Sequence, residues 1–142
     1  MRFWDTSAIV PLLVDEASTP TVRRWLREDQ TVTVWALTRT EAFSALCRRH
    51  REGTIDAVGL ERARTKLSAF AAHWLEVDDL IEVRRHAERL LLDHPLRAAD
   101  ALQLAAAWHW ASGRSRRREL VVLDGPLREA GAAVGFTVVT AR

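Results

Sequence analysis

The sequence predicts an α/β fold in which helices cover both faces of a mostly parallel sheet. One observation supports this. Short segments rich in β-branched and aromatic residues alternate along the chain with longer segments whose apolar residues recur at helical spacing. That alternation is typical of parallel sheets, because a crossover, usually a helix, must follow each strand. The length of 142 residues and the 48% hydrophobic content fit a single domain over residues 1–142 with a substantial core.

The first elements follow from local signals. Residues 2–4 begin an apolar run that is typical of a buried strand. A helix is expected over 19–28, because hydroxyl residues at its start can cap it and Pro20 lies in its first turn. Residues 31–37 are β-branched and aromatic, which favours a second strand. The next helix is expected over 38–51, shortly before a glycine.

The second half of the chain continues the alternation. Its helices show apolar positions at helical spacing, and the tripeptide Asp-His-Pro at 93–95 separates two of them. Its last two strands are rich in valine, as expected for a sheet. The elements expected here are helix 56–72, strand 73–77, helices 79–92 and 97–111, strand 119–124, helix 126–132 and strand 136–140.

Composition narrows the class of protein. The formal charge is +2, and Lys66 is the sole lysine among 21 basic residues, so arginine supplies nearly all the positive charge. The arginine-rich run at 114–118 is either a solvated loop or a loop that contacts phosphate. The single cysteine, Cys47, excludes an internal disulfide and a cysteine-based zinc cluster. No uncharged run is long enough to span a bilayer and no signal peptide is recognisable, so we expect a cytoplasmic protein.

Acidic residues are placed at one edge of the predicted sheet. Asp5 ends the first strand, and Asp124 ends the strand predicted over 119–124. Glu41 lies in the first turn of the helix after the second strand. Ligands of open parallel sheets bind beyond the carboxyl ends of the strands, which is where these three acids should lie. Asp100 joins them if the helix predicted from residue 97 begins at the same edge.

Each acid also has a purely local interpretation. Asp5 could cap a following helical turn, and Asp124 precedes a Gly-Pro pair that is typical of a helix start. Glu41 follows Thr38 at the spacing of a capping box. Asp100 could pair with the arginine one turn before it, which is worth ~0.2–0.5 kcal/mol on an exposed helix face.

Taken together, the four acids favour a metal site. Carboxylates gathered at one edge repel one another and raise their own pKa values unless a cation lies among them. Oxygen ligands suit Mg²⁺ or Mn²⁺, and no histidine or cysteine spacing in the chain competes for a softer metal. Such an ion would polarise a phosphoryl oxygen and activate a water, so the pattern predicts phosphate-ester hydrolysis.

Four blocks of sequence carry these acids, namely FWDTSAIVPLLVDE, TRTEAFSAL, HPLRAADALQLAAA and LVVLDGPLREAGAAVGFTVV. In this order they resemble the motifs of the PIN-domain (PilT N-terminus) ribonucleases, especially the VapC-type toxins of type II toxin–antitoxin pairs. The resemblance implies a three-layer α/β/α sandwich with a central, mostly parallel sheet of four to five strands. It also implies a Mg²⁺-dependent endoribonuclease, with Mn²⁺ as a substitute, that acts on RNA. Such toxins are usually homodimers held inactive by a cognate antitoxin.

The resemblance also assigns roles to the acids. Asp5, Glu41 and Asp100 match three acids of the family, and Asp124 matches a fourth, more variable one. Asp5 and Asp100 are the expected direct metal ligands, whereas Glu41 and Asp124 are expected to bind directly or through water. The chain departs from the pattern at Val122, where many relatives have a hydroxyl residue that would help to order the fourth acid or its water.

Four further residues have expected supporting roles. Thr6 or Ser7 matches a hydroxyl that supports the first acid in the family. Arg97 and Arg39 are expected to lie near the acidic edge and to hold RNA phosphates.

Two other functions remain open. The chain could be a different phosphate-ester hydrolase, although a haloacid-dehalogenase-like phosphatase would need an aspartate where Ser7 stands. It could also be a non-catalytic RNA-binding domain of the same fold, although all four acids are present.

Overall fold

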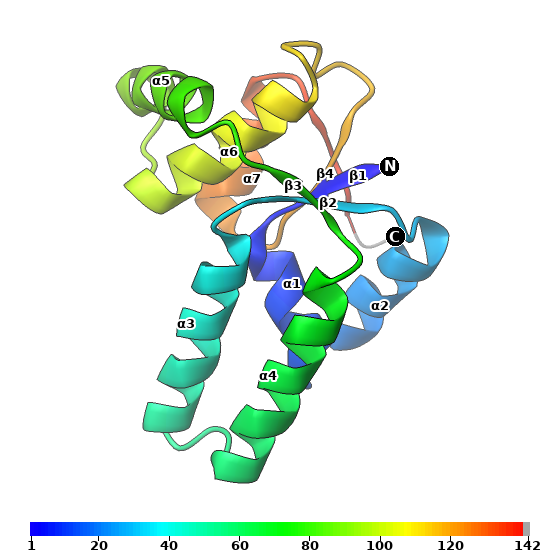
Figure 1. Ribbon diagram of the computed structural model, residues 1–142. Coiled ribbons are helices and arrows are strands. Elements are labelled where there is room, and N and C mark those ends of the chain that lie inside the picture. The colour runs from blue at the N-terminus through cyan, green and yellow to red at the C-terminus, as the bar shows by residue number, and fades with distance from the viewer. Residues whose placement is uncertain (141–142) are drawn as a thin grey trace.

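The computed structural model describes residues 1–140 and contains one sheet of five strands in the order β3-β2-β1-β4-β5 (Figure 1). The strands are β1 (Arg2–Trp4), β2 (Val32–Trp35), β3 (Leu75–Val77), β4 (Glu119–Val121) and β5 (Thr137–Val138). All four pairings are parallel, so the predicted α/β class with a parallel sheet is confirmed. Residues 141–142, the end of the predicted domain, lie outside the described range.

Helices form a layer on each face of the sheet. Within residues 1–140 they are α1 (Thr6–Leu13), α2 (Thr19–Glu28), α3 (Thr38–Arg51), α4 (Ala57–Ala71), α5 (Leu80–Asp93), α6 (Ala98–Trp110) and α7 (Gly125–Ala133). The first four pack with Trp4 in one apolar cluster, and the last three pack with Phe3 in another. Neighbouring residues of one strand point to opposite faces, which is why β1 supplies both clusters. Each helix is too short or too polar to span a lipid bilayer.

Helix α1 is the element that the sequence analysis missed. Four of its apolar residues are buried, and Pro11 lies inside it, where proline usually breaks a helix. A helix that is apolar on nearly every side has no amphipathic periodicity to detect. The segment was therefore interpreted only as a possible helical turn after Asp5.

The other elements agree with the predicted boundaries to within three residues. The largest difference is at β4, which was expected to continue to Asp124 but ends at Val121. Asp124 instead caps α7, so it lies beyond the end of the strand rather than in it.

The chain order opens a crevice between β1 and β4. The chain leaves β1 into α1 on one face of the sheet and leaves β4 into α7 on the other face (Figure 1). Neighbouring strands whose connections leave on opposite faces form the usual ligand-binding crevice of open α/β sheets. Trp4 pairs with Val121, and the Asp5 N–H donates to the Val121 carbonyl at 2.9 Å. The segments that carry Asp5 and Asp124 therefore leave the sheet as neighbours.

Candidate active site

A cleft of about 1040 Å³ lies at the carboxyl edge of the sheet. Glu41 on α3, Asp100 on α6 and Asp124 before α7 line it. Asp5 is only 5% exposed, and its carboxylate interacts electrostatically with Asp100 and Glu41. The structure therefore brings together all four acids that the sequence predicted, including Asp100, whose position depended on where α6 begins.

Asp5 is both a helix cap and a buried charge. Its Oδ2 accepts the Ser7 N–H at 2.8 Å and so caps α1, as the local interpretation predicted. Burial raises the pKa of Asp5 to about 6, the charge of Asp100 adds to the rise, and hydrogen bonds from Ser7 oppose it. Within residues 1–140 no basic side chain forms an ion pair with Asp5. Capping therefore occupies one carboxylate oxygen but leaves the charge without a counter-ion.

Glu41 faces the cleft from the first turn of α3. Burial, together with the charges of Asp5 and Asp100, raises the pKa of Glu41 to about 7 against the opposing hydrogen bond from Gln103. Its Oε1 accepts a hydrogen bond from Gln103 Nε2 at 3.1 Å. The capping box considered at Thr38 is not formed, because the N-cap of α3 is the preceding residue and it makes no side-chain cap.

Asp100 lies in the first turn of α6, between opposing charges. Burial raises the pKa of Asp100, and Asp124 raises it further, whereas the positive charge of Arg97 lowers it. Arg97 is the N-cap residue of α6 and lines the cleft, as predicted. Arg97 therefore interacts electrostatically with Asp100, but the pKa of Asp100 is still raised overall.

Asp124 caps α7 by accepting the Leu127 N–H at 3.0 Å. The turn before it is held by Ser7, whose Oγ accepts the backbone N–H of Leu123 at 2.9 Å and that of Asp124 at 3.3 Å. Val122, where the resemblance would place a hydroxyl residue, is fully buried in the apolar cluster beneath α5 to α7. In this chain it is Ser7, on α1, that orders the segment carrying the fourth acid.

Comparisons with known proteins identify the family. The family model described as PIN domain matches residues 2–128. The chain belongs to the PIN-domain family. The resemblance seen in the four sequence blocks is therefore confirmed at the level of the family. Comparison with curated protein sequences finds no match.

Several solved structures have the same fold as this chain over nearly the whole length of both proteins. VapC20 from Mycobacterium tuberculosis, described as a Sarcin-Ricin loop cleaving toxin, has a TM-score of 0.70 at 19% identity, over 96% of this chain and 97% of that one. FitAcB from Neisseria gonorrhoeae has a TM-score of 0.65 at 18% identity, over 99% and 97%. A toxin–antitoxin complex from Klebsiella pneumoniae has a TM-score of 0.64 at 18% identity, over 99% and 97%. These matches confirm the three-layer α/β/α sandwich.

Of the two arginines expected near the acidic edge, Arg97 lines the cleft and Arg39 does not. Arg39 lies outside the wall of the PIN-domain cleft, and its Nη2 donates to Ser68 Oγ on α4 at 3.3 Å. The cleft wall instead includes Arg48 and Arg49, and Arg49 is ion-paired with Glu16. Residues 41, 45 and 48 share one face of a helix, so spacing from Glu41 could have identified Arg48.

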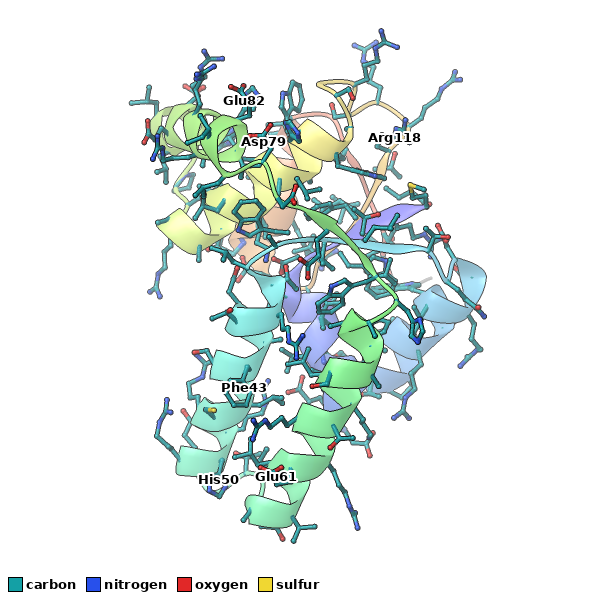
Figure 2. All side chains as sticks on the ribbon, viewed as in Figure 1. Phe43, His50, Glu61, Asp79, Glu82 and Arg118 are labelled. Carbon is teal, nitrogen blue, oxygen red and sulfur yellow. The ribbon has the colours of Figure 1, made fainter. Side chains whose placement is uncertain are left out.

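The arginine-rich run at 114–118 lies at the other edge of the sheet. It immediately precedes β4, so it is at the amino ends of the strands, whereas the acids are at the carboxyl ends. Arg118 (Figure 2) lies over the Trp110 ring at 5.3 Å. The tip of the α3–α4 pair, with His50 and Glu61, also extends away from the sheet (Figure 2). Residues 114–118, His50 and Glu61 are not among the residues that line the cleft.

The donor set of the cleft fits a hard divalent cation. Carboxylate and hydroxyl oxygens are the available ligands, and three carboxylates have raised pKa values. Within residues 1–140 no three His, Cys, Asp or Glu side chains are arranged closely enough to hold a metal together. Mg²⁺ usually takes one or two protein carboxylates and keeps several waters, so a pair of direct ligands with water-mediated contacts is sufficient.

Proposed function

We propose that this PIN-domain chain is a Mg²⁺-dependent endoribonuclease that hydrolyses RNA phosphodiester bonds and acts as the toxin of a toxin–antitoxin pair. The main support is that Glu41, Asp100 and Asp124, from distant parts of the chain, line one cleft, and that the buried Asp5 interacts electrostatically with two of them. Burial and mutual repulsion raise the pKa values of three of them. Such a cluster is unfavourable in the folded protein unless a cation neutralises it.

In this proposal Asp5 and Asp100 hold the ion directly, and Glu41 and Asp124 hold it directly or through water. When bound, Mg²⁺ would supply Lewis acidity toward the phosphodiester and would make a bound water more acidic than bulk water. Thr6 and Ser7 support this arrangement from the start of α1. Ser7 contributes by ordering the turn before Asp124.

Arginine side chains on the same cleft wall favour a polyanionic substrate. Arg48 is exposed, Arg97 lies at the start of α6, and both line the cleft that contains the acids. With the scissile phosphate at the acids, neighbouring phosphates of an RNA chain could contact these arginines. A small phosphomonoester has no neighbouring phosphates that could contact these arginines. This supports the nuclease over another phosphate-ester hydrolase.

The proposed partners are a cognate antitoxin protein and a second copy of the chain. One structure that shares the fold is described as a toxin–antitoxin complex, and another is described as bound to a DNA fragment. This supports an antitoxin partner. The homodimer follows from the resemblance and is tested by analytical ultracentrifugation, in which a monomer at micromolar concentration would contradict it.

A cleavage assay on defined RNAs tests the proposed activity. The purified full chain should cut RNA with Mg²⁺ or Mn²⁺ and stop when EDTA is added. Asp100→Asn should lower the rate by more than the roughly 10- to 100-fold typical of residues that only support a metal ligand. Asp56→Asn is the matched control, because Asp56 caps α4 outside the cleft.

The same assay separates the alternatives. Hydrolysis of small phosphomonoesters without RNA cleavage would favour another phosphatase. RNA binding without cleavage by the unsubstituted protein would favour a non-catalytic domain. For the toxin role, induced expression should arrest growth, and co-expression of a small protein encoded beside it should relieve the arrest.

A further inference from the structure

Gln103 is a buried amide that connects the two helix layers at the candidate active site. It lies on α6 one turn after Asp100 and is 1% exposed. Its Nε2 lies 2.8 Å from Thr6 Oγ1, 3.0 Å from Thr38 Oγ1 and 3.1 Å from Glu41 Oε1. The first of these residues begins α1, and the other two are in the first turn of α3. A side chain of one layer therefore contacts two helices of the other.

Gln103 presents its Nε2 end to Glu41. An ionised carboxylate only accepts hydrogen bonds, so it requires the Nε2 end of Gln103, and the opposite orientation would bring two acceptors together. The two threonine hydroxyls can share the remaining donor capacity. Within the described residues Gln103 Oε1 has no hydrogen-bond partner. The amide is therefore arranged around its donors and not around its acceptor.

Gln103 is the one polar side chain among the buried residues of α6. The others are alanine and leucine, which pack without polar atoms. A buried carbonyl oxygen that lacks a partner is unfavourable for folding. The contacts that oppose this cost are those of Nε2 with the three oxygens.

Gln103 provides a directional contact between α6 and the opposite helix layer, as Ser7 does between α1 and the segment before α7. Apolar packing is non-directional, whereas a hydrogen bond constrains where its two partners lie. Asp100 is on α6, Glu41 is on α3, and Asp5 immediately precedes α1. The placement of these three elements sets the distances between their carboxylates.

We propose that Gln103 is a positioning residue whose amide ties α6 to the starts of α1 and α3, and so sets how Asp100, Glu41 and Asp5 lie relative to one another around a divalent cation. The inference rests on the proposed function, because it assumes that these acids bind a metal. Gln103 is not itself assigned as a metal ligand or a catalytic residue.

Calorimetric titration of Mn²⁺ into the full chain tests this role. Gln103→Met has a similar unbranched shape and removes the amide, so it should raise the Mn²⁺ dissociation constant by roughly 10- to 100-fold. Leu104→Met is the matched control, since Leu104 is on the same helix, is 1% exposed and lies in the apolar cluster. It should leave Mn²⁺ binding unchanged. Thermal unfolding of each variant confirms that it is folded.

A second measurement needs no change in the core. Gln30 and Gln103 are the only glutamines in the chain, and it contains no asparagine. A ¹H–¹⁵N spectrum should therefore contain two pairs of side-chain amide signals, and loss of one pair in Gln30→Ala assigns both, because Gln30 is exposed. On addition of Mg²⁺, the Gln103 pair should shift and the Gln30 pair should not. The Gln103 protons should also exchange more slowly with solvent.

Failure of this inference can be distinguished from failure of the proposed function. A folded Gln103→Met that binds Mn²⁺ as tightly as the parent, or a Gln103 amide signal that Mg²⁺ does not move, overturns the positioning role. If Asp100→Asn still abolishes RNA cleavage in that case, the nuclease proposal stands. If the unsubstituted chain neither binds Mn²⁺ nor cleaves RNA, the proposed function is wrong and the positioning role falls with it.

Discussion

Replacing Asp5 by asparagine would remove a buried charge and keep the helix cap. Asparagine and aspartate cap helices about equally well. The asparagine side-chain oxygen can accept the Ser7 N–H, which Asp5 Oδ2 accepts at 2.8 Å. The two side chains also have nearly the same shape, so the apolar surroundings need not change. Asp5→Asn therefore isolates the effect of the charge.

The size of that effect follows from the pKa. Burial raises the pKa of Asp5 from 3.8 to about 6. At about 1.4 kcal/mol per pH unit, ionised Asp5 lowers the free energy of unfolding of the metal-free protein by at most ~3 kcal/mol. The folded state holds this proton more tightly than the unfolded state. The stabilising contribution is therefore complete below about pH 4 and is lost as the pH rises through about 6.

Urea unfolding in EDTA at several pH values measures this difference. Above about pH 7, Asp5→Asn should be more stable than the parent by ~1–3 kcal/mol, and the difference should shrink toward zero near pH 4. Added Mg²⁺ should stabilise the parent, because it binds the folded state, and should stabilise Asp5→Asn much less. Asp56→Asn is the matched control, since Asp56 caps α4 by accepting the Gly59 N–H at 2.7 Å and lies outside the cleft. It should show no such pH-dependent gain.

One result would refute this reasoning. If metal-free Asp5→Asn were less stable than the parent near pH 8, the charge of Asp5 would be favourable in the fold without any cation. The carboxylate would then have a purely structural role, and the argument that a metal offsets its burial would fail.

Three further predictions test other contacts. Ser7→Ala leaves two backbone N–H groups without their acceptor and should lower the free energy of unfolding by ~1–3 kcal/mol, so an unchanged urea midpoint would contradict it. Arg48→Ala should raise the KM for RNA by a larger factor than it lowers kcat. It should also raise KM more than Arg39→Ala does, because Arg48 lines the cleft and Arg39 does not. Steady-state kinetics in which the two variants change KM equally would contradict this. Gly131→Ala places a Cβ 2.6 Å from Leu120 Cδ2 and should destabilise the protein by ~1–3 kcal/mol, measured as a lower Tm.

The order of the elements and the location of the candidate site could be predicted from sequence. Both predictions depend on signals that lie within short segments of the sequence. Helical and strand periodicity are visible within one segment, and the carboxyl ends of parallel strands always share an edge. Asp5 and Asp124 could therefore be placed together although they are far apart in the chain. Even the local caps at these two residues were foreseen, and the structure shows that a cap and a shared acidic cluster coexist.

Only the tertiary structure decided which side chains surround the acids. The hydrogen bond from Gln103 to Thr6 joins residues 97 positions apart, and the one from Asp124 to Ser7 spans 117 positions. Neither leaves a local periodic signal. The raised pKa values likewise result from burial by several elements at once. Helix α1 escaped detection because it is buried on nearly all sides, so its apolar residues show no amphipathic periodicity. Residue patterns along the chain determine which secondary structure a segment forms. Packing between segments determines which hydrogen-bond partners and charges surround each polar atom.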